Sequence, residues 1–89
     1  MVVKFFATLR NLTGEKECSL TLNATLRELL AILCEKYGCS LASALLFEGG
    51  LHPDILILVN GRAIEHLNGL ETVLKDEDII SIFPKMAGG

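Results

Sequence analysis

One amphipathic helix, flanked on both sides by strand-like segments, constrains the fold more than any other feature. Residues 25–28 read Thr-Leu-Arg-Glu, a capping box in which the Thr25 hydroxyl accepts the Glu28 N–H and the Glu28 carboxylate accepts the Thr25 N–H. The apolar positions that follow at helical spacing are Leu26, Leu29, Leu30, Leu33 and Tyr37. Gly38 then gives a helix-ending signal. The sequence therefore predicts one helix with a single apolar face to bury.

The segment before the helix reads as a pair of antiparallel strands. Residues 2–9 are rich in Val and Phe and alternate loosely, which favours a strand. Residues 11–16 are polar and contain Thr13-Gly14, which is typical of a hairpin loop. Residues 18–22 alternate polar with apolar side chains. We expect these residues to form the second strand, antiparallel to the first.

The segment after the helix ends in a second set of strands. Residues 54–59 form an uninterrupted apolar strand, and Asn60-Gly61 is the strongest short hairpin signal in the chain. Residues 62–64 then begin the return strand. A further turn at Asn68-Gly69 precedes a short strand over residues 70–74.

A polar turn separates that short strand from the last one. Residues 75–78 carry three acidic side chains, for which a solvated turn is a better interpretation than a metal site. Residues 79–83 form the final apolar strand. Residues 39–53 remain ambiguous: 41–47 could form a short helical turn, and Gly49-Gly50 a loop without a phosphate-binding motif.

The order β-β-α-β-β-β predicts an α+β fold, a β-grasp. Its mixed sheet has four to five strands, and one main helix is packed on one face. We expect the first and last strands to lie parallel at the centre, with the C-terminal tail at one edge of the sheet. The domain would span residues 1–83 and the tail residues 84–89.

The second face of the sheet could be either covered or exposed. The strands 55–59 and 79–83 are apolar on both faces, as in centrally buried strands, yet the single convincing helix covers only one. Either the segment 39–53 covers the other face, or that face is an exposed apolar patch that marks a protein interface. We favour a partner surface that continues into Phe83, Pro84 and Met86.

The C-terminal end of the chain reads as a thin strip of backbone. Pro84 has no N–H for a sheet and should stop the last strand. Gly88 and Gly89 carry no side chain and lose the most entropy on ordering. Such a tail can thread a narrow channel in another protein and present its carboxylate to chemistry there.

Composition excludes several classes of function. The net charge is −3 and the eight Lys and Arg residues are scattered, which disfavours nucleic acid as a partner. No apolar run approaches the roughly 18 residues of a membrane span. An odd number of cysteines, Cys18, Cys34 and Cys39, indicates reduced thiols and a cytoplasmic location. His52 and His66 lie far apart, and we find neither a catalytic set nor a metal site.

Four motifs carry a resemblance to a known family. The first is Phe-Phe-Ala-x-Leu-Arg-x-x-x-Gly at 5–14, near the start of the chain. The second and third are Val-Asn-Gly-Arg at 59–62 and Gly-Leu-Glu-Thr at 69–72. The fourth is Leu-Lys-Asp-x-Asp-x-x-Ser-Ile-Phe-Pro at 74–84, which precedes the terminal Gly-Gly. The sequence resembles the molybdopterin synthase small-subunit family, within the ubiquitin-like β-grasp sulfur-carrier superfamily. The match is specific in the C-terminal half and weak over 38–53. Lys85 and Met86 depart from the apolar Pro-Pro-Val that the family often carries there.

The resemblance implies a sulfur carrier that has no active site of its own. An activating enzyme would use ATP to adenylate the Gly89 carboxylate, and a sulfur species would convert it to a thiocarboxylate. The tail would then enter the large subunit of molybdopterin synthase and donate sulfur for the dithiolene of molybdopterin. Gly89 would bear the sulfur, and the partner-binding residues would be Phe83, Pro84, Met86, Ala87 and Gly88. This chain itself would bind no nucleotide, metal or other cofactor.

Three alternatives stay open at the level of sequence. The chain could carry sulfur for thiamine or cysteine biosynthesis. It could also be a ubiquitin-like modifier, joined through Gly89 to lysines of target proteins. The carriers and the modifier share the adenylation step. The third alternative is an interaction domain whose Gly-Gly tail has no function.

Overall fold

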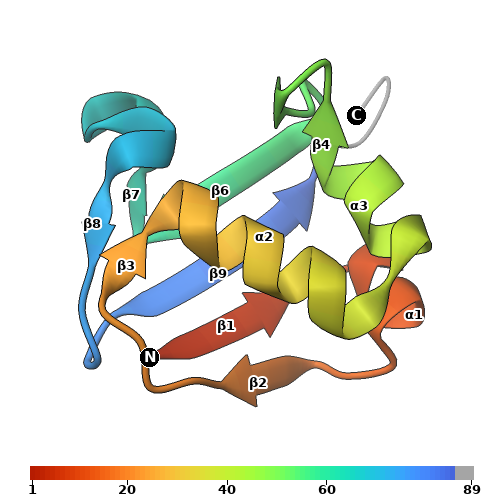
Figure 1. Cartoon of the computed structure of the whole chain (residues 1–89), viewed down its shortest axis with the longest axis horizontal. Coiled ribbons are helices and arrows are strands. Elements are labelled where there is room, and N and C mark those ends of the chain that lie inside the picture. Colours follow the sequence, from red (N-terminus) through yellow and green to blue (C-terminus); the bar gives the residue numbers. More distant parts are fainter. Residues whose placement is uncertain (86–89) are drawn as a thin grey trace.

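The computed structural model describes residues 1–85 and shows a mixed five-stranded sheet with its main helix on one face (Figure 1). The sheet strands, in spatial order, are β2 (Glu17–Ser19), β1 (Val2–Phe5), β9 (Ile79–Pro84), β6 (Ile55–Val59) and β7 (Arg62–Ala63). Two small ladders pair β3 (Ala24–Thr25) with β8 (Val73–Leu74) and β4 (Leu46–Phe47) with β5 (Gly50–Leu51). The helices are α1 (Thr8–Thr13), α2 (Leu26–Tyr37), α3 (Cys39–Leu45) and the 3₁₀ turns η1 (Ile64–His66) and η2 (Gly69–Glu71).

The first and last strands lie side by side at the centre of the sheet, as the sequence predicts. Strand β1 runs parallel to β9, with Val3 opposite Ile80 and Phe5 opposite Ile82. Strand β9 is antiparallel to β6 on its other side. The α+β class and the β-grasp arrangement are therefore confirmed. The chain leaves the sheet from the end of its central strand rather than from a strand at the margin.

One face of the sheet and helix α2 enclose the core. The inward side chains of β1, β6 and β9 alternate with outward ones, and the apolar stripe of α2 packs against them. Fully buried members of this core include Phe5, Leu29, Leu33, Ile57 and Ile82. The stripe read from the sequence is therefore the buried face of α2.

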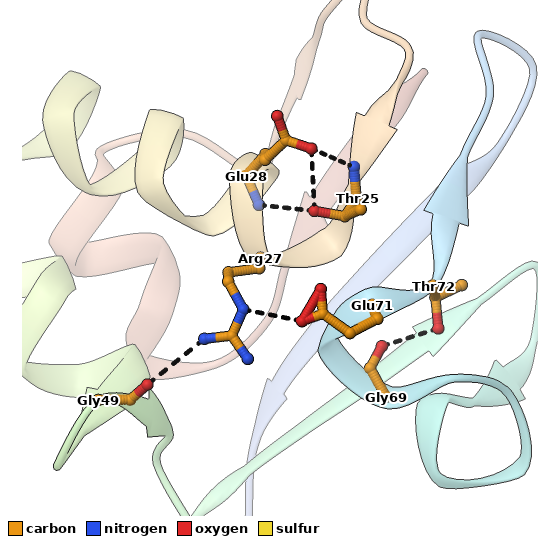
Figure 2. A network of polar contacts seen from close by, with 7 residues as sticks. All are labelled: Thr25, Arg27, Glu28, Gly49, Gly69, Glu71 and Thr72. Atoms are coloured by element: carbon orange, nitrogen blue, oxygen red, sulfur yellow. Dashed lines mark hydrogen bonds and ion pairs between the residues drawn. The ribbon is translucent and has the colours of Figure 1, made fainter.

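The start of α2 is fixed by the predicted capping box (Figure 2). The Glu28 N–H donates to the Thr25 hydroxyl at 3.3 Å, and the Thr25 N–H donates to the Glu28 carboxylate at 3.0 Å. The Thr25 N–H and the Thr25 hydroxyl both donate to the Glu28 carboxylate, and these two hydrogen bonds lower the pKa of Glu28 below its ordinary value. At the other end, the Tyr37 hydroxyl donates to Glu15 at 2.7 Å, which ties the helix to the segment before β2. Both ends of the helix are therefore anchored.

The first strand is shorter than the sequence indicates. Strand β1 ends at Phe5, and Ala7 adopts a positive φ of 53° before the chain enters α1. The prediction of a strand through residue 9 was wrong, and the loop expected over 11–16 is confirmed only for 14–16, because 11–13 belong to α1. The physical reason is the spacing of Leu9 and Leu12, three residues apart, which lets one helical turn bring both side chains to the core.

The segment 39–53 lies on the helical side of the molecule. It forms α3 and the β4–β5 hairpin, and Figure 1 shows both on the same side of the sheet as α2. Leu41 and Leu45 of α3 are fully buried in the core that α2 shares. Coverage of the second sheet face by residues 39–53, one of the two possibilities above, is therefore wrong.

The later strands follow the sequence closely, with small differences. Asn60 and Gly61 have φ values of 52° and 85° in the turn between β6 and β7, which confirms this hairpin. The short strand expected over 70–74 reduces to β8, which pairs with β3 outside the main sheet. Pro84 is the last residue of β9, so the strand ends one residue later than expected. The division between domain and tail at residue 84 stays a prediction.

The cysteines are unpaired, as expected. Cys18 is buried, Cys34 is half-buried and Cys39 is exposed. Burial raises the pKa of the Cys34 thiol. Within residues 1–85, no helix has the length and apolar character needed to cross a membrane.

Candidate functional site

The face of the sheet that points away from α2 is the first candidate. Along β1, β6 and β9, every second side chain is buried against the helix, so the alternate ones point to the opposite face. No helix of residues 1–85 crosses behind the sheet in Figure 1. We call this the open face; its residues from the three strands are Val2, Lys4, Leu56, Leu58, Ile79, Ser81 and Phe83.

Two stacked aromatic rings form the centre of the apolar area on this side. The rings of Phe6 and Phe83 lie 4.2 Å apart between centroids and are inclined by only 13°. The guanidinium of Arg10 lies over the Phe6 ring, 5.5 Å from its centroid, and its Nε donates to the Phe5 carbonyl at 2.9 Å. Ring and cation therefore hold one another in a fixed position. Rigid aromatic and Arg groups of this kind dominate the energy of many protein interfaces.

The charges around the stacked rings are mainly positive. Lys4 and Arg10 lie on or beside the open face, and Lys85 follows β9 directly. The nearby carboxylate residues are Glu17, which lies opposite Lys4 in the β1–β2 register, and Asp54, whose carbonyl accepts the Lys85 N–H. A partner for this face is therefore expected to combine apolar side chains with acidic ones.

The point where the chain leaves the sheet is held firmly by backbone hydrogen bonds. Pro84 lies opposite Ile55, and the Lys85 N–H donates to the Asp54 carbonyl at 2.6 Å. The Asp54 N–H donates to Nδ1 of His52 at 3.0 Å, and the His52 N–H donates to the Leu45 carbonyl at 2.7 Å. The last described residue therefore has a defined direction relative to the open face.

The predicted site residues fall into two groups. Phe83 and Pro84 lie on β9, and Phe83 is part of the stacked pair. Met86, Ala87, Gly88 and Gly89 lie outside the described residues. The sheet face that carries Phe83 is uncovered within the described residues, while its role as a partner surface and the roles assigned to the four terminal residues stay predictions.

Sequence reasoning missed Phe6 and Arg10 as part of this site. Both belong to the motif at 5–14, but the prediction of a strand through residue 9 obscured their positions. The signal was the alternation itself: Phe5 is buried on one face, so its neighbour Phe6 had to face the other way. The turn at Ala7 then brings Arg10 back over the Phe6 ring.

The acidic segment 75–78 has a structural role. Asn60 donates to Oδ1 of Asp78 at 2.9 Å, and the Lys75 N–H donates to Oδ2 at 2.8 Å. These two hydrogen bonds lower the pKa of Asp78. Asp76 accepts the Leu22 N–H at 3.1 Å. Over residues 1–85, no group of three His, Cys, Asp or Glu side chains is arranged to hold a metal ion.

Known proteins resemble this chain over nearly its whole length. The family model described as the ThiS family matches residues 3–89. Small archaeal modifier protein 3 of Haloferax volcanii is 38% identical over 89 residues, which cover 98% of this chain and 96% of the relative. A putative sulfur carrier protein of Archaeoglobus fulgidus is 42% identical over 65 residues, or 73% of this chain and 74% of the relative.

A solved structure extends the likeness to the fold. A chain in the crystal structure of the Amycolatopsis orientalis BexX/CysO complex has a TM-score of 0.85 and 31% identity, and the alignment covers 99% of this chain and 98% of that one. The shared fold is the ubiquitin-like β-grasp, in which a mixed five-stranded sheet packs on its helix. The chain belongs to the ThiS family of ubiquitin-like sulfur carriers and modifiers.

Proposed function

We propose that this chain carries sulfur as a thiocarboxylate on Gly89 and donates it, as the small subunit of molybdopterin synthase, for dithiolene formation in molybdopterin. One observation carries the docking part of this proposal. Phe83, whose ring stacks on that of Phe6, lies on β9, the strand after which the chain continues to the C-terminal Gly-Gly sequence. A partner that binds the open face is thereby placed at the start of the tail. The acceptor assignment rests on the sequence motifs at 5–14, 59–62, 69–72 and 74–84.

The chemistry requires activation of the Gly89 carboxylate, because a carboxylate is a poor acyl electrophile. A carboxylate oxygen attacks the α-phosphorus of ATP, and pyrophosphate leaves. A hydrosulfide equivalent from a sulfur donor then attacks the carbonyl carbon, the bond to AMP breaks, and the thiocarboxylate remains. Because glycine has no side chain, a nucleophile can approach the carbonyl carbon of Gly89 from either face. The nucleotide belongs to the activating enzyme in this scheme, and this chain supplies the acyl group.

The open face serves two partners in turn. An activating enzyme and the large subunit of the synthase would each bind the Phe6–Phe83 pair and receive the tail. The positive side chains Lys4, Arg10 and Lys85 favour acidic rims on both partners. Lys85 stands where related tails are often apolar, so the channel entrance of the partner should carry a carboxylate.

Reconstitution with purified partners tests the proposal. The chain, its activating enzyme, ATP and sulfide are combined, and the C-terminal peptide is analysed by mass spectrometry. We expect a mass gain for one oxygen replaced by sulfur on Gly89, and dithiolene formation after the large subunit and the pterin precursor are added. A thiocarboxylate that forms but never yields dithiolene would reject the molybdopterin assignment and retain the sulfur carrier.

A second candidate function is a ubiquitin-like protein modifier. The 38% identity to a small archaeal modifier protein over 98% of the chain favours it. The same acyl-adenylate would then be attacked by the amine of a target lysine, AMP would leave, and an isopeptide bond would form. Isopeptide-linked Gly89 in the proteome of the host, abolished by deletion of the activating enzyme, would support this function.

A further inference from the structure

A small apolar pocket lies on the helical side of the molecule, where the sulfur-carrier function gives it no role. It has a volume of about 150 Å³ and lies between α2, the β4–β5 hairpin and η2. Its lining consists of Arg27, Leu30, Ala31, Leu46, Gly49, Gly50 and Leu70. Because its lining comes from α2, the β4–β5 hairpin and η2, the pocket lies on the helical side of the molecule and not on the open face.

The walls of the pocket come from leucines that also pack in or against the core, and from two glycines. Leu30 supplies the floor from the buried stripe of α2, and Leu46 and Leu70 supply half-buried walls. Gly49 and Gly50 form the third side; a Cβ added at either would meet no atom within 4 Å. The pocket thus stays open because this side of the hairpin carries no side chain.

Arg27 forms the polar rim and links the three elements (Figure 2). Its Nε donates to the Glu71 carboxylate at 3.0 Å, and Nη1 lies 3.5 Å from the Gly49 carbonyl. The side chains of Arg27 and Glu71 are 54% and 63% exposed, so this ion pair is weak and easily rearranged by a ligand. The rim is therefore polar and adjustable, while the interior is apolar.

The charges on the surrounding elements define the kind of ligand. The first turn of α2, the hairpin and η2 carry one guanidinium, Arg27, against three carboxylates, Glu28, Glu48 and Glu71. Arg27 is already neutralised by Glu71, and within residues 1–85 no ion pair involves Glu48. The helical side is thus acidic around the pocket. A ligand for the pocket should carry positive charge beside an apolar group.

We propose that this pocket binds one aliphatic side chain of a partner protein, presented on a segment with Lys or Arg on either side. An apolar space of about 150 Å³ is large enough for a molecule of the size of benzene, and a Leu side chain is of similar size. The flanking cations would lie near Glu48 and Glu28. The helical side would thereby hold a second partner while the open face and tail are engaged elsewhere.

The test is an NMR titration of the ¹⁵N-labelled full chain with the peptide acetyl-Arg-Lys-Leu-Lys-Arg-amide. We expect shifts in the amide signals of the pocket lining, above all Ala31, Gly49 and Gly50, and none at Phe6 or Phe83. Replacing the peptide Leu by Ala should weaken binding about fiftyfold, since three buried carbons are lost. Replacing its Lys and Arg by Glu should abolish binding.

Protein variants sharpen the test. Ala31→Phe fills the pocket from an exposed helical position and should abolish the shifts, whereas Ser43→Phe adds the same bulk on α3 outside the pocket and should leave binding unchanged. Glu48→Lys should weaken binding several-fold. A wild-type chain that shows no shifts, equal binding of the acidic peptide, or shifts only with free benzene would overturn the proposal. None of these results bears on sulfur transfer through Gly89.

Discussion

Phe83 is the residue at which the fold and the proposed function meet. Its backbone belongs to the central strand β9, while its ring stacks on Phe6 outside the core. Because the ring lies on the side away from α2, its removal leaves the core intact. The sequence pointed to Phe83 through its place before the tail; its partner Phe6 became visible only once the turn at Ala7 was known.

Phe83→Ala should weaken binding to the activating enzyme and to the large subunit by about 2 kcal/mol, as expected for an aromatic hot spot. Isothermal titration calorimetry measures the loss, and circular dichroism checks the fold. Phe47→Ala is the matched control, because Phe47 is also aromatic and is 54% exposed, but lies on β4 of the helical side. Equal affinity of the Phe83 variant and wild type would show that the open face is not the docking surface.

The capping box at the start of α2 gives a pH-dependent prediction. The Thr25 hydrogen bonds lower the pKa of Glu28 in the folded chain below its ordinary value of 4.5. The unfolded chain therefore binds more protons in this range, so the stabilisation is present above pH 4.5 and is lost as the pH falls through the lower, folded pKa.

Thermal unfolding between pH 7 and pH 3 checks this. Glu28→Gln should unfold with a flatter pH dependence than wild type over the range below 4.5. Thr25→Ala should lower stability at neutral pH by about 1 kcal/mol, because the helix loses its N-cap. Parallel pH curves for the Gln variant and wild type would mean that the Glu28 carboxylate makes no such contribution.

At the scale of elements, the sequence predicted what periodicity determines and failed where tertiary contacts decide. The helix 26–37 and the hairpin at Asn60-Gly61 have local signals strong enough to fix them. The sequence signal for helix α1 consists only of Leu9 and Leu12. The Val- and Phe-rich start of the chain favoured a strand instead, so the helix was not predicted. Helix α3 lies on the same side of the sheet as α2 because Leu41 and Leu45 are buried in the core. No local sequence pattern predicts this burial.

The central strand β9 should be the most sensitive element. Ile82 is fully buried between β1 and β6, so Ile82→Ala should destabilise the chain by about 2–4 kcal/mol through the cavity it leaves. Ile79 lies on the same strand but is 42% exposed, and Ile79→Ala should cost well under half as much. Denaturant unfolding of the two variants measures both. Similar losses would contradict the assignment of inward and outward positions along β9.

At the scale of the whole molecule, the β-grasp separates the open face of the sheet from the helical side (Figure 1). The sequence predicted the exposed apolar face from strands that are apolar on both sides, and the location of 39–53 on the helical side removed the alternative. The Arg27 pocket had no sequence signal, because its lining comes from three segments far apart in the chain. Only the folded structure brings them together.

The threading of the tail gives a prediction for the molecule as a substrate. Gly88→Val should block activation of the chain, because a β-branched residue stiffens the backbone and adds bulk at a narrow channel. Pyrophosphate release by the activating enzyme measures the effect. Ser43→Val is the control: Ser43 is an exposed residue of α3, and its replacement should leave the rate of pyrophosphate release unchanged. A normal rate for the Gly88 variant would contradict the threading argument.

The most direct measurement of the central claim is the intact mass of this protein recovered from its own host under non-reducing conditions, with fragmentation of the C-terminal peptide. The account predicts a fraction in which one oxygen is replaced by sulfur, located on Gly89, and lost when the activating enzyme is deleted. Gly89 found only in isopeptide bonds to lysines of other proteins, with no sulfur-bearing form in the same cells, would contradict sulfur carriage and make protein modification the function of the chain.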